Sequence, residues 1–342
     1  MPAPWLHAAW AEGAETRRQD RETIMTNQAP LPQLDGELFL TDAGCETDLI
    51  FNKGVPIREF AAHTLLEDEA GRAALADYYR GFLSLARDTG AGMVLDAPTW
   101  KAHAHWADDL GCSVDDLAVA NRDAVAFSRS LRDEYADSSG PIVVNGLVGP
   151  RGDAYAPETL LSVAEAERYH RTQIQWLADA GADMVTALTF THTEEAVGTV
   201  RAATSVGVPV VVSFTVETDG RLPSGQLLGD AVQRLDDETD GGAAYLMVNC
   251  AHPDHIRPAL DGDWVDRIRG VRCNASRQSH AELDAAEVLD DGDPTEFAAG
   301  YLELRRLLPQ LNVVGGCCGS DLRHVTAIAR AFTTWDRQPI RA

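Results

Sequence analysis

The stretch ADMVTALTFTHTEEAVGTVRAATSVGVPVVVSFT, residues 182–215, contains the pattern that decides the fold. Residues 182–190 and 208–215 are short apolar runs of the kind that form strands buried on both faces. Between them, residues 194–207 have apolar side chains at helical spacing and end in a glycine. A buried strand, a helix and a second buried strand predict a parallel β-α-β unit.

The same unit repeats along most of the chain. Eight apolar runs, bounded by Gly, Pro or Asp, lie at residues 37–44, 92–99, 142–149, 182–190, 208–215, 244–251, 268–275 and 311–318. Residues 162–181 form another helical pattern, in which Ser162 and Glu165 predict a capping box. Eight strands alternating with helices predict a (β/α)8 TIM barrel. A doubly wound open sheet is the alternative, but it usually has fewer strands and a glycine-rich phosphate turn, which the chain lacks.

Length and composition fit one barrel domain with a short extension. The 342 residues exceed the roughly 250 that a TIM barrel needs, and 45% of them are hydrophobic. Residues 1–35 mix charge, Ala and Pro without a strand pattern, so we expect an N-terminal extension that is flexible or forms a short helix. The barrel itself is expected over residues 36–336.

The charge and the apolar pattern exclude several classes of partner. Asp and Glu outnumber Lys and Arg by 53 to 29, and the resulting negative surface should repel nucleic acid and anionic membranes. No run approaches the roughly 18 apolar residues of a membrane-spanning helix, and the first 30 residues contain no apolar secretory signal. We therefore expect a cytoplasmic protein with small-molecule partners.

Three of the six cysteines fall at the ends of predicted strands. Cys250 ends the sixth run, and Cys317 and Cys318 end the eighth, flanked by Gly315 and Gly316 before them and Gly319 after them. In a TIM barrel these ends surround one mouth, so the three thiols should converge. Three thiolates favour zinc and leave one tetrahedral position open, as in catalytic zinc sites. Because neighbouring strand residues point to opposite faces, we expect the glycines to supply unusual dihedral angles that turn both sulfurs inward.

The alternative for any single cysteine is a small buried hydrophobic residue. That interpretation is preferred for the remaining three, which are Cys45, Cys112 and Cys273, with a place in the pocket lining as the alternative for Cys45. His252 and His255 follow Cys250 closely, but three cysteines suffice for a zinc site, so neither histidine is expected to be a ligand. His280 and Glu282 are given no role.

The cysteine pattern resembles that of the homocysteine S-methyltransferase family over about residues 36–332. The matching motifs are VNC at 248–250, GGCCG at 315–319, TDAGCETDL at 41–49, DAPTWKA at 96–102 and GLVGPRGDAY at 146–155. The resemblance implies a (β/α)8 barrel that binds one zinc ion through Cys250, Cys317 and Cys318. It also implies an S-methyltransferase that moves a methyl group from a sulfonium or ammonium donor to a zinc-bound thiolate, with homocysteine as acceptor and methionine as product.

The resemblance further implies contacts to the substrate. Asp42 matches a family aspartate that contacts the amino group of homocysteine, and Asn274 matches an asparagine after the seventh strand. The family places a glutamate after the fourth strand as a second amine contact. Here that position falls near Leu188, with Thr189 next to it, so no carboxylate stands there.

The end of the second strand could replace this missing contact. Asp96 is the acid expected to do so, with Thr99 and Trp100 beside it in the substrate pocket. Trp100 could face a cationic methyl donor through a cation–π contact. A hydrogen-bonded loop carboxylate and a packed aromatic side chain are the alternatives for Asp96 and Trp100.

Three other functions remain open at the level of sequence. The acceptor could be a different thiol or selenol, because the amine contacts are altered. A zinc lyase or hydrolase would place water at the open metal position, with Asp96 or Asp42 as base. A non-enzymatic zinc or redox module would oxidise Cys317 and Cys318 to a disulfide. The sequence identifies neither the methyl donor nor the oligomeric state.

Overall fold

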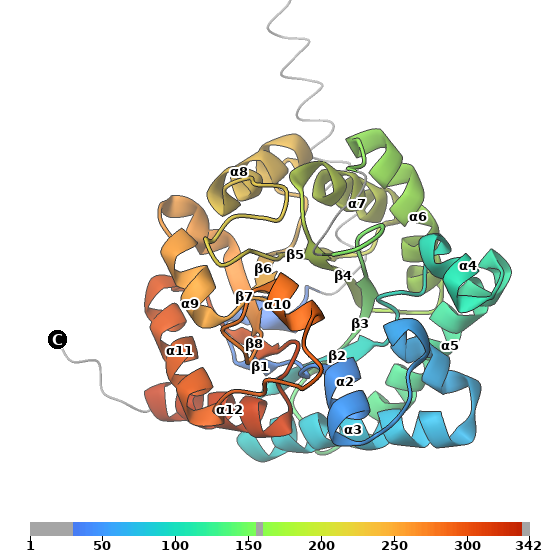
Figure 1. The fold of residues 1–342 in the computed structure, drawn as a ribbon, viewed down its shortest axis with the longest axis horizontal. Helices are drawn as coiled ribbons and strands as arrows, with labels where there is room; N and C mark the ends of the chain where they lie inside the picture. The colour runs from blue at the N-terminus through green and yellow to red at the C-terminus, as the bar shows by residue number, and fades with distance from the viewer. Residues whose placement is uncertain (1–29, 155–159, 337–342) are drawn as a thin grey trace, which may run out of the picture.

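The fold is a closed barrel of eight parallel strands surrounded by helices, which confirms the (β/α)8 prediction (Figure 1). The computed structural model describes residues 30–154 and 160–336. Each strand pairs in parallel with the next, and the last pairs with the first. The strands are β1 (Phe39–Leu40), β2 (Gly92–Ala97), β3 (Ile142–Val148), β4 (Met184–Phe190), β5 (Val210–Phe214), β6 (Leu246–Asn249), β7 (Ile268–Cys273) and β8 (Val313–Gly316).

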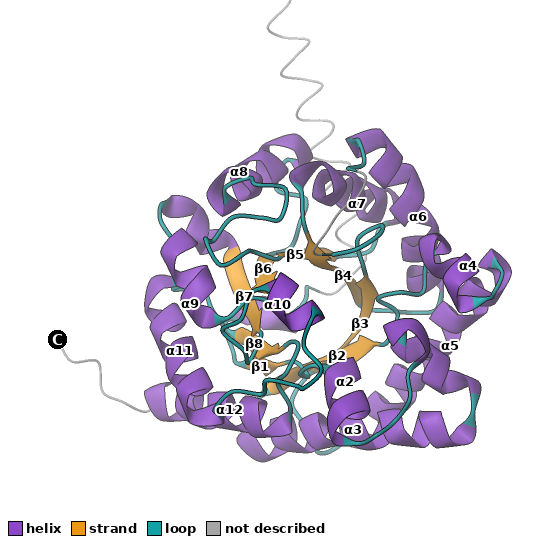
Figure 2. Ribbon diagram, viewed as in Figure 1, coloured by secondary structure: helices purple, strands orange, loops and turns teal. Residues whose placement is uncertain are grey.

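Most helices lie outside the ring of strands and cover it (Figure 2). The helices are α2 (Cys45–Thr47), α3 (Glu69–Thr89), α4 (Ala107–Leu110), α5 (Val114–Tyr135), α6 (Val163–Asp179), α7 (Thr193–Val206), α8 (Leu228–Thr239), α9 (Pro253–Ile256), α10 (His280–Asp284), α11 (Pro294–Leu307) and α12 (Leu322–Asp336). The predicted capping box of Ser162 and Glu165 opens α6, and Gly207 ends α7 with a left-handed backbone. Within the described ranges, no helix combines the length and the apolar character that a membrane span requires.

An apolar cluster fills the barrel at the N-terminal ends of its strands. Its fully buried members are Leu31, Phe39, Val94, Val143, Met184, Val211, Tyr245, Met247 and Val313. Gln33, in a short 3-10 helix (Pro32–Asp35), is 0% exposed, and its Nε2 donates to the Tyr245 hydroxyl at 3.3 Å. Residues 31–35 therefore close this end of the barrel, although they fall within the predicted extension. Residues 1–29 lie outside the described residues, and the division into domains stays a prediction.

A polar layer lies next to this cluster, two residues further along the strands. Side chains alternate along a strand, so Val94 and Asp96 share the inward face of β2. Asn145 Nδ2 donates to Asp96 Oδ1 at 2.7 Å, and Thr186 Oγ1 donates to Asn145 Oδ1 at 3.0 Å. These hydrogen bonds join β2, β3 and β4, and this polar layer lies on the side of the cluster nearer the C-terminal mouth of the barrel.

Candidate metal and substrate site

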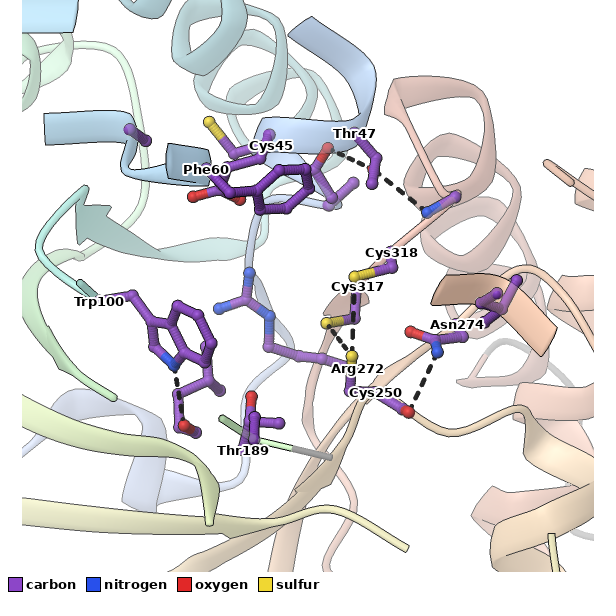
Figure 3. Close-up of a pocket in the computed structure, with 18 of the residues that line it drawn as sticks. Cys45, Thr47, Phe60, Trp100, Thr189, Cys250, Arg272, Asn274, Cys317 and Cys318 are labelled. Atoms are coloured by element: carbon purple, nitrogen blue, oxygen red, sulfur yellow. Dashed lines mark hydrogen bonds between the residues drawn. The ribbon is translucent and has the colours of Figure 1, made fainter. Parts of the chain in front are cut away.

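Three cysteine sulfurs lie together at the mouth of the barrel (Figure 3). Cys250 Sγ is 3.1 Å from Cys317 Sγ and 3.7 Å from Cys318 Sγ. In the part of the chain that the structure describes, this is the one group of three or more His, Cys, Asp or Glu residues whose ligand atoms all lie within 4.8 Å of one another. Sulfurs that share one tetrahedral metal at about 2.3 Å would be about 3.8 Å apart. The donor set and its spacing therefore fit one soft metal ion after small adjustments.

The glycines before the paired cysteines make room for neighbouring segments. A Cβ atom on Gly315 would lie 1.9 Å from Thr41 Oγ1, and one on Gly316 would lie 1.9 Å from Ser320 Oγ. Neither glycine has a positive φ, whereas Cys250 has a φ of 58°. The expectation of unusual dihedral angles is therefore wrong for Gly315 and Gly316, whereas Gly319, directly after Cys318, has a φ of 79°. Gly315 and Gly316 allow β8 to approach its neighbours closely, and the left-handed Cys250 is itself one of the three cysteines.

Two side chains bind the backbone of Cys250 in this strained conformation. Asn274 Nδ2 donates to the Cys250 carbonyl oxygen at 3.0 Å, and His280 Nε2 lies 2.6 Å from the same atom. His280 Nδ1 lies 3.0 Å from a carboxylate oxygen of Glu217. A left-handed backbone at a residue other than glycine costs roughly 1–3 kcal/mol, so these contacts stabilise the turn that presents the Cys250 sulfur. Asn274 was expected at the substrate, and His280 had no predicted role.

The surroundings of Cys317 favour its ionised form. Hydrogen bonds from the thiols of Cys250 and Cys318 hold the pKa of Cys317 well below its usual range, and the nearby Arg272 guanidinium acts in the same direction. Asn249 Nδ2 also approaches the Cys317 sulfur at 3.9 Å. Because the thiolate is the form that binds metals, this environment suits a metal ligand.

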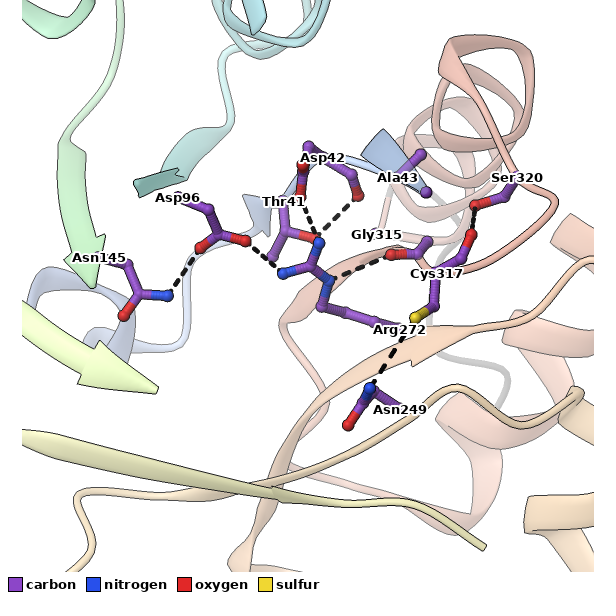
Figure 4. Close-up of polar contacts among 12 residues, drawn as sticks. Thr41, Asp42, Ala43, Asp96, Asn145, Asn249, Arg272, Gly315, Cys317 and Ser320 are labelled. Carbon is purple, nitrogen blue, oxygen red and sulfur yellow. Dashed lines mark hydrogen bonds and ion pairs between the residues drawn. The ribbon is translucent and has the colours of Figure 1, made fainter. Parts of the chain in front are cut away.

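A buried ion cluster lies beside the cysteines, with Arg272 of β7 at its centre (Figure 4). Its Nη2 pairs with Asp42 and its Nη1 pairs with Asp96, while its Nε donates to the Gly316 carbonyl oxygen at 3.1 Å. The three charged side chains are 6%, 4% and 1% exposed, respectively. Charges removed from water to this extent require a partner of opposite sign, and the cluster supplies it.

The structure brings some of the predicted substrate residues to one cavity and places others elsewhere. Asp42, Trp100 and Asn274 line the cavity together with the three cysteines, but Asp96 and Thr99 are not among its lining residues. Thr99 Oγ1 donates to the Leu147 carbonyl oxygen at 2.8 Å. Both carboxylate oxygens of Asp96 are bound, one by Asn145 and one by Arg272. For Asp96 to contact a substrate, this cluster would have to open.

The cavity has the size and lining of a small-molecule site. Its volume is about 420 Å³, within the roughly 300–1,000 Å³ of typical ligand pockets. Phe60, Trp100, Trp106 and Leu188 give it apolar walls. Trp100 Nε1 donates to the Leu188 carbonyl oxygen at 2.9 Å, which fixes the indole ring. Figure 3 shows this ring on the opposite side of the cavity from the cysteines.

Glu46 is a carboxylate of the cavity that sequence reasoning missed. It lies on the short helix α2, lines the cavity and is partly buried. Burial raises the pKa of Glu46 to about 7, and the charge of Cys317 acts in the same direction. The available signal was its place in TDAGCETDL, four residues after Asp42 in the segment that follows the first strand.

Comparison with known sequences confirms the resemblance of the motifs. The family model described as homocysteine S-methyltransferase matches residues 39–332. Betaine–homocysteine S-methyltransferase 1 of Rattus norvegicus is 29% identical over 220 residues, which are 57% of this chain and 50% of that protein. S-methylmethionine–homocysteine S-methyltransferase BHMT2 of Rattus norvegicus is 25% identical over 232 residues, or 60% and 58% of the two chains. The chain thus spans about half the length of the curated relatives that it matches.

Solved structures share the fold. The oxidised form of the homocysteine methyltransferase MmuM from Escherichia coli has a TM-score of 0.69 at 19% identity, covering 86% of this chain and 96% of that chain. Its metallated form has a TM-score of 0.67 at 21% identity with the same coverage.

Proposed function

The chain belongs to the homocysteine S-methyltransferase family, and from this premise we propose that it transfers a methyl group to the sulfur of homocysteine, giving methionine. The observation that carries the proposal is the group of three cysteine sulfurs that opens into the cavity. We propose Cys250, Cys317 and Cys318 as ligands of one zinc ion, because three thiolates with one open position are typical of catalytic zinc sites. Zinc bound there would keep the acceptor sulfur in its thiolate form near neutral pH.

The proposed reaction forms one bond and breaks one. The acceptor thiol loses its proton to solvent, and its sulfur attacks the methyl carbon of a sulfonium or ammonium donor. The bond between that carbon and the donor atom breaks, and the donor atom keeps the bonding electron pair and becomes the neutral sulfur of a thioether or nitrogen of an amine. Because this leaving group needs no proton, the main contribution of the protein is to bind and orient two substrates.

The aromatic wall of the cavity suits a cationic donor. Trp100 lies across the cavity from the cysteines, so a cationic donor bound between them would lie near the indole ring (Figure 3). An aromatic face attracts a cation by about 0.5–2 kcal/mol, depending on how far the cation is removed from water. The hydrogen bond from Trp100 to the Leu188 carbonyl oxygen keeps this face in place.

A different thiol is the second candidate acceptor. Leu188 gives the cavity an apolar wall where the family resemblance expects a carboxylate. A lyase or hydrolase that uses Asp42 or Asp96 as base receives no comparable support. Asp96 does not line the cavity, and Asp42 is bound by Arg272 and by the Tyr78 hydroxyl, so neither acid presents an unbound oxygen to a water molecule at the cysteines.

A matrix of acceptors and donors tests the proposal. Zinc-loaded protein would be incubated with homocysteine, cysteine, glutathione or 4-mercaptobutanoate, each with betaine, S-methylmethionine or S-adenosylmethionine. Mass spectrometry should detect methionine from homocysteine with at least one donor. Cys250→Ala should abolish this product, whereas Cys273→Ala, a buried cysteine outside the group, should retain it. If no pair of acceptor and donor gives a methylated thiol, the proposed function is wrong. If a thiol other than homocysteine is the only one methylated, homocysteine is not the acceptor.

A further inference from the structure

Most acidic side chains that line the cavity are either bound to another side chain or exposed to water. Asp42 is paired with Arg272, and Asp290 accepts a hydrogen bond from Ser276 Oγ at 2.6 Å. Asp153 and Asp284 also line the cavity but are exposed to water. Glu46 is different, because it is partly buried and, among the described residues, makes no ion pair within 4.0 Å.

The two cations of the cavity wall, Arg272 and Lys101, act on Glu46 only through space and make their direct contacts with other groups. Arg272 pairs with Asp42 and Asp96. Lys101 Nζ donates to the Glu59 carbonyl oxygen at 2.8 Å and lies 3.9 Å from the centre of the Trp106 ring. A carboxylate that is partly removed from water is unfavourable unless a cation accompanies it. A ligand that enters the cavity with a positive group would supply that cation.

Glu46 stands close to the cysteines without belonging to their group. A Cβ atom on Gly44, two residues before it, would lie 2.6 Å from the Cys317 carbonyl oxygen. Thr47 Oγ1, one residue after it, accepts from the Gly319 backbone N–H at 3.1 Å (Figure 3). Glu46 therefore lies on a segment whose flanking residues, Gly44 and Thr47, both pack against residues 317–319. Its carboxylate is not among the ligand atoms gathered within 4.8 Å, so a fourth-ligand role is not indicated.

We propose that Glu46 binds the amino group of the thiol acceptor and thereby selects short amino thiols. The inference rests on the proposed function, because it requires an acceptor whose sulfur lies at the cysteines. An amino group a few bonds from that sulfur would reach the same part of the cavity wall. Glu46 then provides the contact that Leu188 lacks and that Asp42 and Asp96, both bound by Arg272, do not offer.

A binding experiment tests this role without any methyl donor. Homocysteine and 4-mercaptobutanoate share a thiol and a carboxylate, but only homocysteine has the amino group. Calorimetric titration of zinc-loaded wild type should show homocysteine binding about ten- to hundredfold more tightly, the range expected for one charge-assisted contact. Glu46→Gln should remove this preference and leave the affinity for 4-mercaptobutanoate within about twofold. Glu46→Asp, which keeps the charge, should retain part of it.

The control is Asp284→Asn, which removes an exposed charge from the rim of the same cavity and should preserve the preference. Zinc content is measured for every variant. The inference is overturned if wild type shows no preference for the amino thiol, or if Glu46→Gln keeps it. If wild type methylates homocysteine but Glu46→Gln still prefers the amino thiol, Glu46 lacks this role while the proposed function stands. If no thiol is methylated at all, the proposed function itself fails.

Discussion

At the scale of single residues, Arg272 neutralises two carboxylates that burial would otherwise make unstable. Desolvation raises the pKa of Asp42 well above its usual value, and Arg272 acts in the opposite direction. The same guanidinium lowers the pKa of Cys317. One side chain on β7 thus links the polar interior of the barrel to the candidate metal site.

We expect Arg272→Met to be strongly destabilising, because it leaves Asp42 and Asp96 buried without a cation. Breaking a buried ion pair in this way costs about 3–5 kcal/mol, measurable by urea denaturation. The triple variant Arg272→Met, Asp42→Asn, Asp96→Asn removes all three charges and should recover at least half of the loss. A single variant as stable as wild type would show that the cluster contributes little.

The cysteine ligands give a second prediction at this scale. Purified protein should contain close to one zinc ion per chain, and Cys317→Ala should lose most of it, because two sulfurs hold zinc much more weakly than three. Zinc is measured by atomic emission on protein purified without chelators. Cys45→Ala removes a buried cysteine outside the group and should keep its zinc. Equal zinc content in both variants would contradict the assignment.

At the scale of elements, the turn after β6 presents Cys250 through its left-handed backbone. We expect Asn274→Ala to weaken zinc binding by about ten- to hundredfold, the range typical of outer contacts that orient ligands. Competition with a fluorescent chelator measures this affinity. Gln278→Ala, an exposed position on the same loop, is the matched control and should bind zinc normally. Unchanged affinity in Asn274→Ala would mean that His280 alone maintains the turn.

The 3-10 helix Ala62–Glu67 makes stability depend on pH through His63. His63 is 6% exposed, and burial lowers its pKa to about 4, whereas an unfolded histidine titrates near 6.5. The stability that neutral, buried His63 contributes is therefore complete above pH 6.5 and is lost as the pH falls toward 4. Between pH 7.5 and 5 the free energy of unfolding should fall by about 2 kcal/mol from this group.

Urea denaturation of metal-free, reduced protein at pH 7.5, 6 and 5 measures this effect. His63→Gln cannot titrate in this range, so its stability should fall less with pH than that of wild type by about the same 2 kcal/mol. Other buried histidines are common to both proteins and cancel in the comparison. Parallel pH profiles for the two proteins would refute the role of His63.

At the scale of the whole molecule, the closed end of the barrel depends on residues that precede β1. Leu31 is buried in the apolar cluster, and Asn312 Nδ2 donates to the Gln33 carbonyl oxygen at 2.8 Å. A chain that begins at residue 30 should unfold at nearly the temperature of the full chain. A chain that begins at residue 37 should lose about 3 kcal/mol or more, because it uncovers apolar side chains and removes the contacts that Gln33 makes with Asn312 and the Tyr245 hydroxyl. Equal thermal stability of the two shortened chains would contradict this.

The sequence by itself determined the barrel, the positions of its main helices and the convergence of three cysteines. These features follow from local patterns. A buried strand needs a short apolar run, and a helix needs apolar side chains at helical spacing. The ends of parallel strands meet at one mouth, so the order of the runs already brings Cys250 near Cys317 and Cys318.

The tertiary structure alone decided which charged groups are available at that mouth. Asp42 matched an expected substrate contact and Asp96 was the expected replacement for another, yet both are bound to Arg272, which no local pattern marks as buried. Glu46 was given no role from the sequence, yet it lines the cavity without an ion-pair partner among the described residues. Pairing of charges depends on distances between strands far apart in sequence, and an apolar or helical period contains no information about those distances.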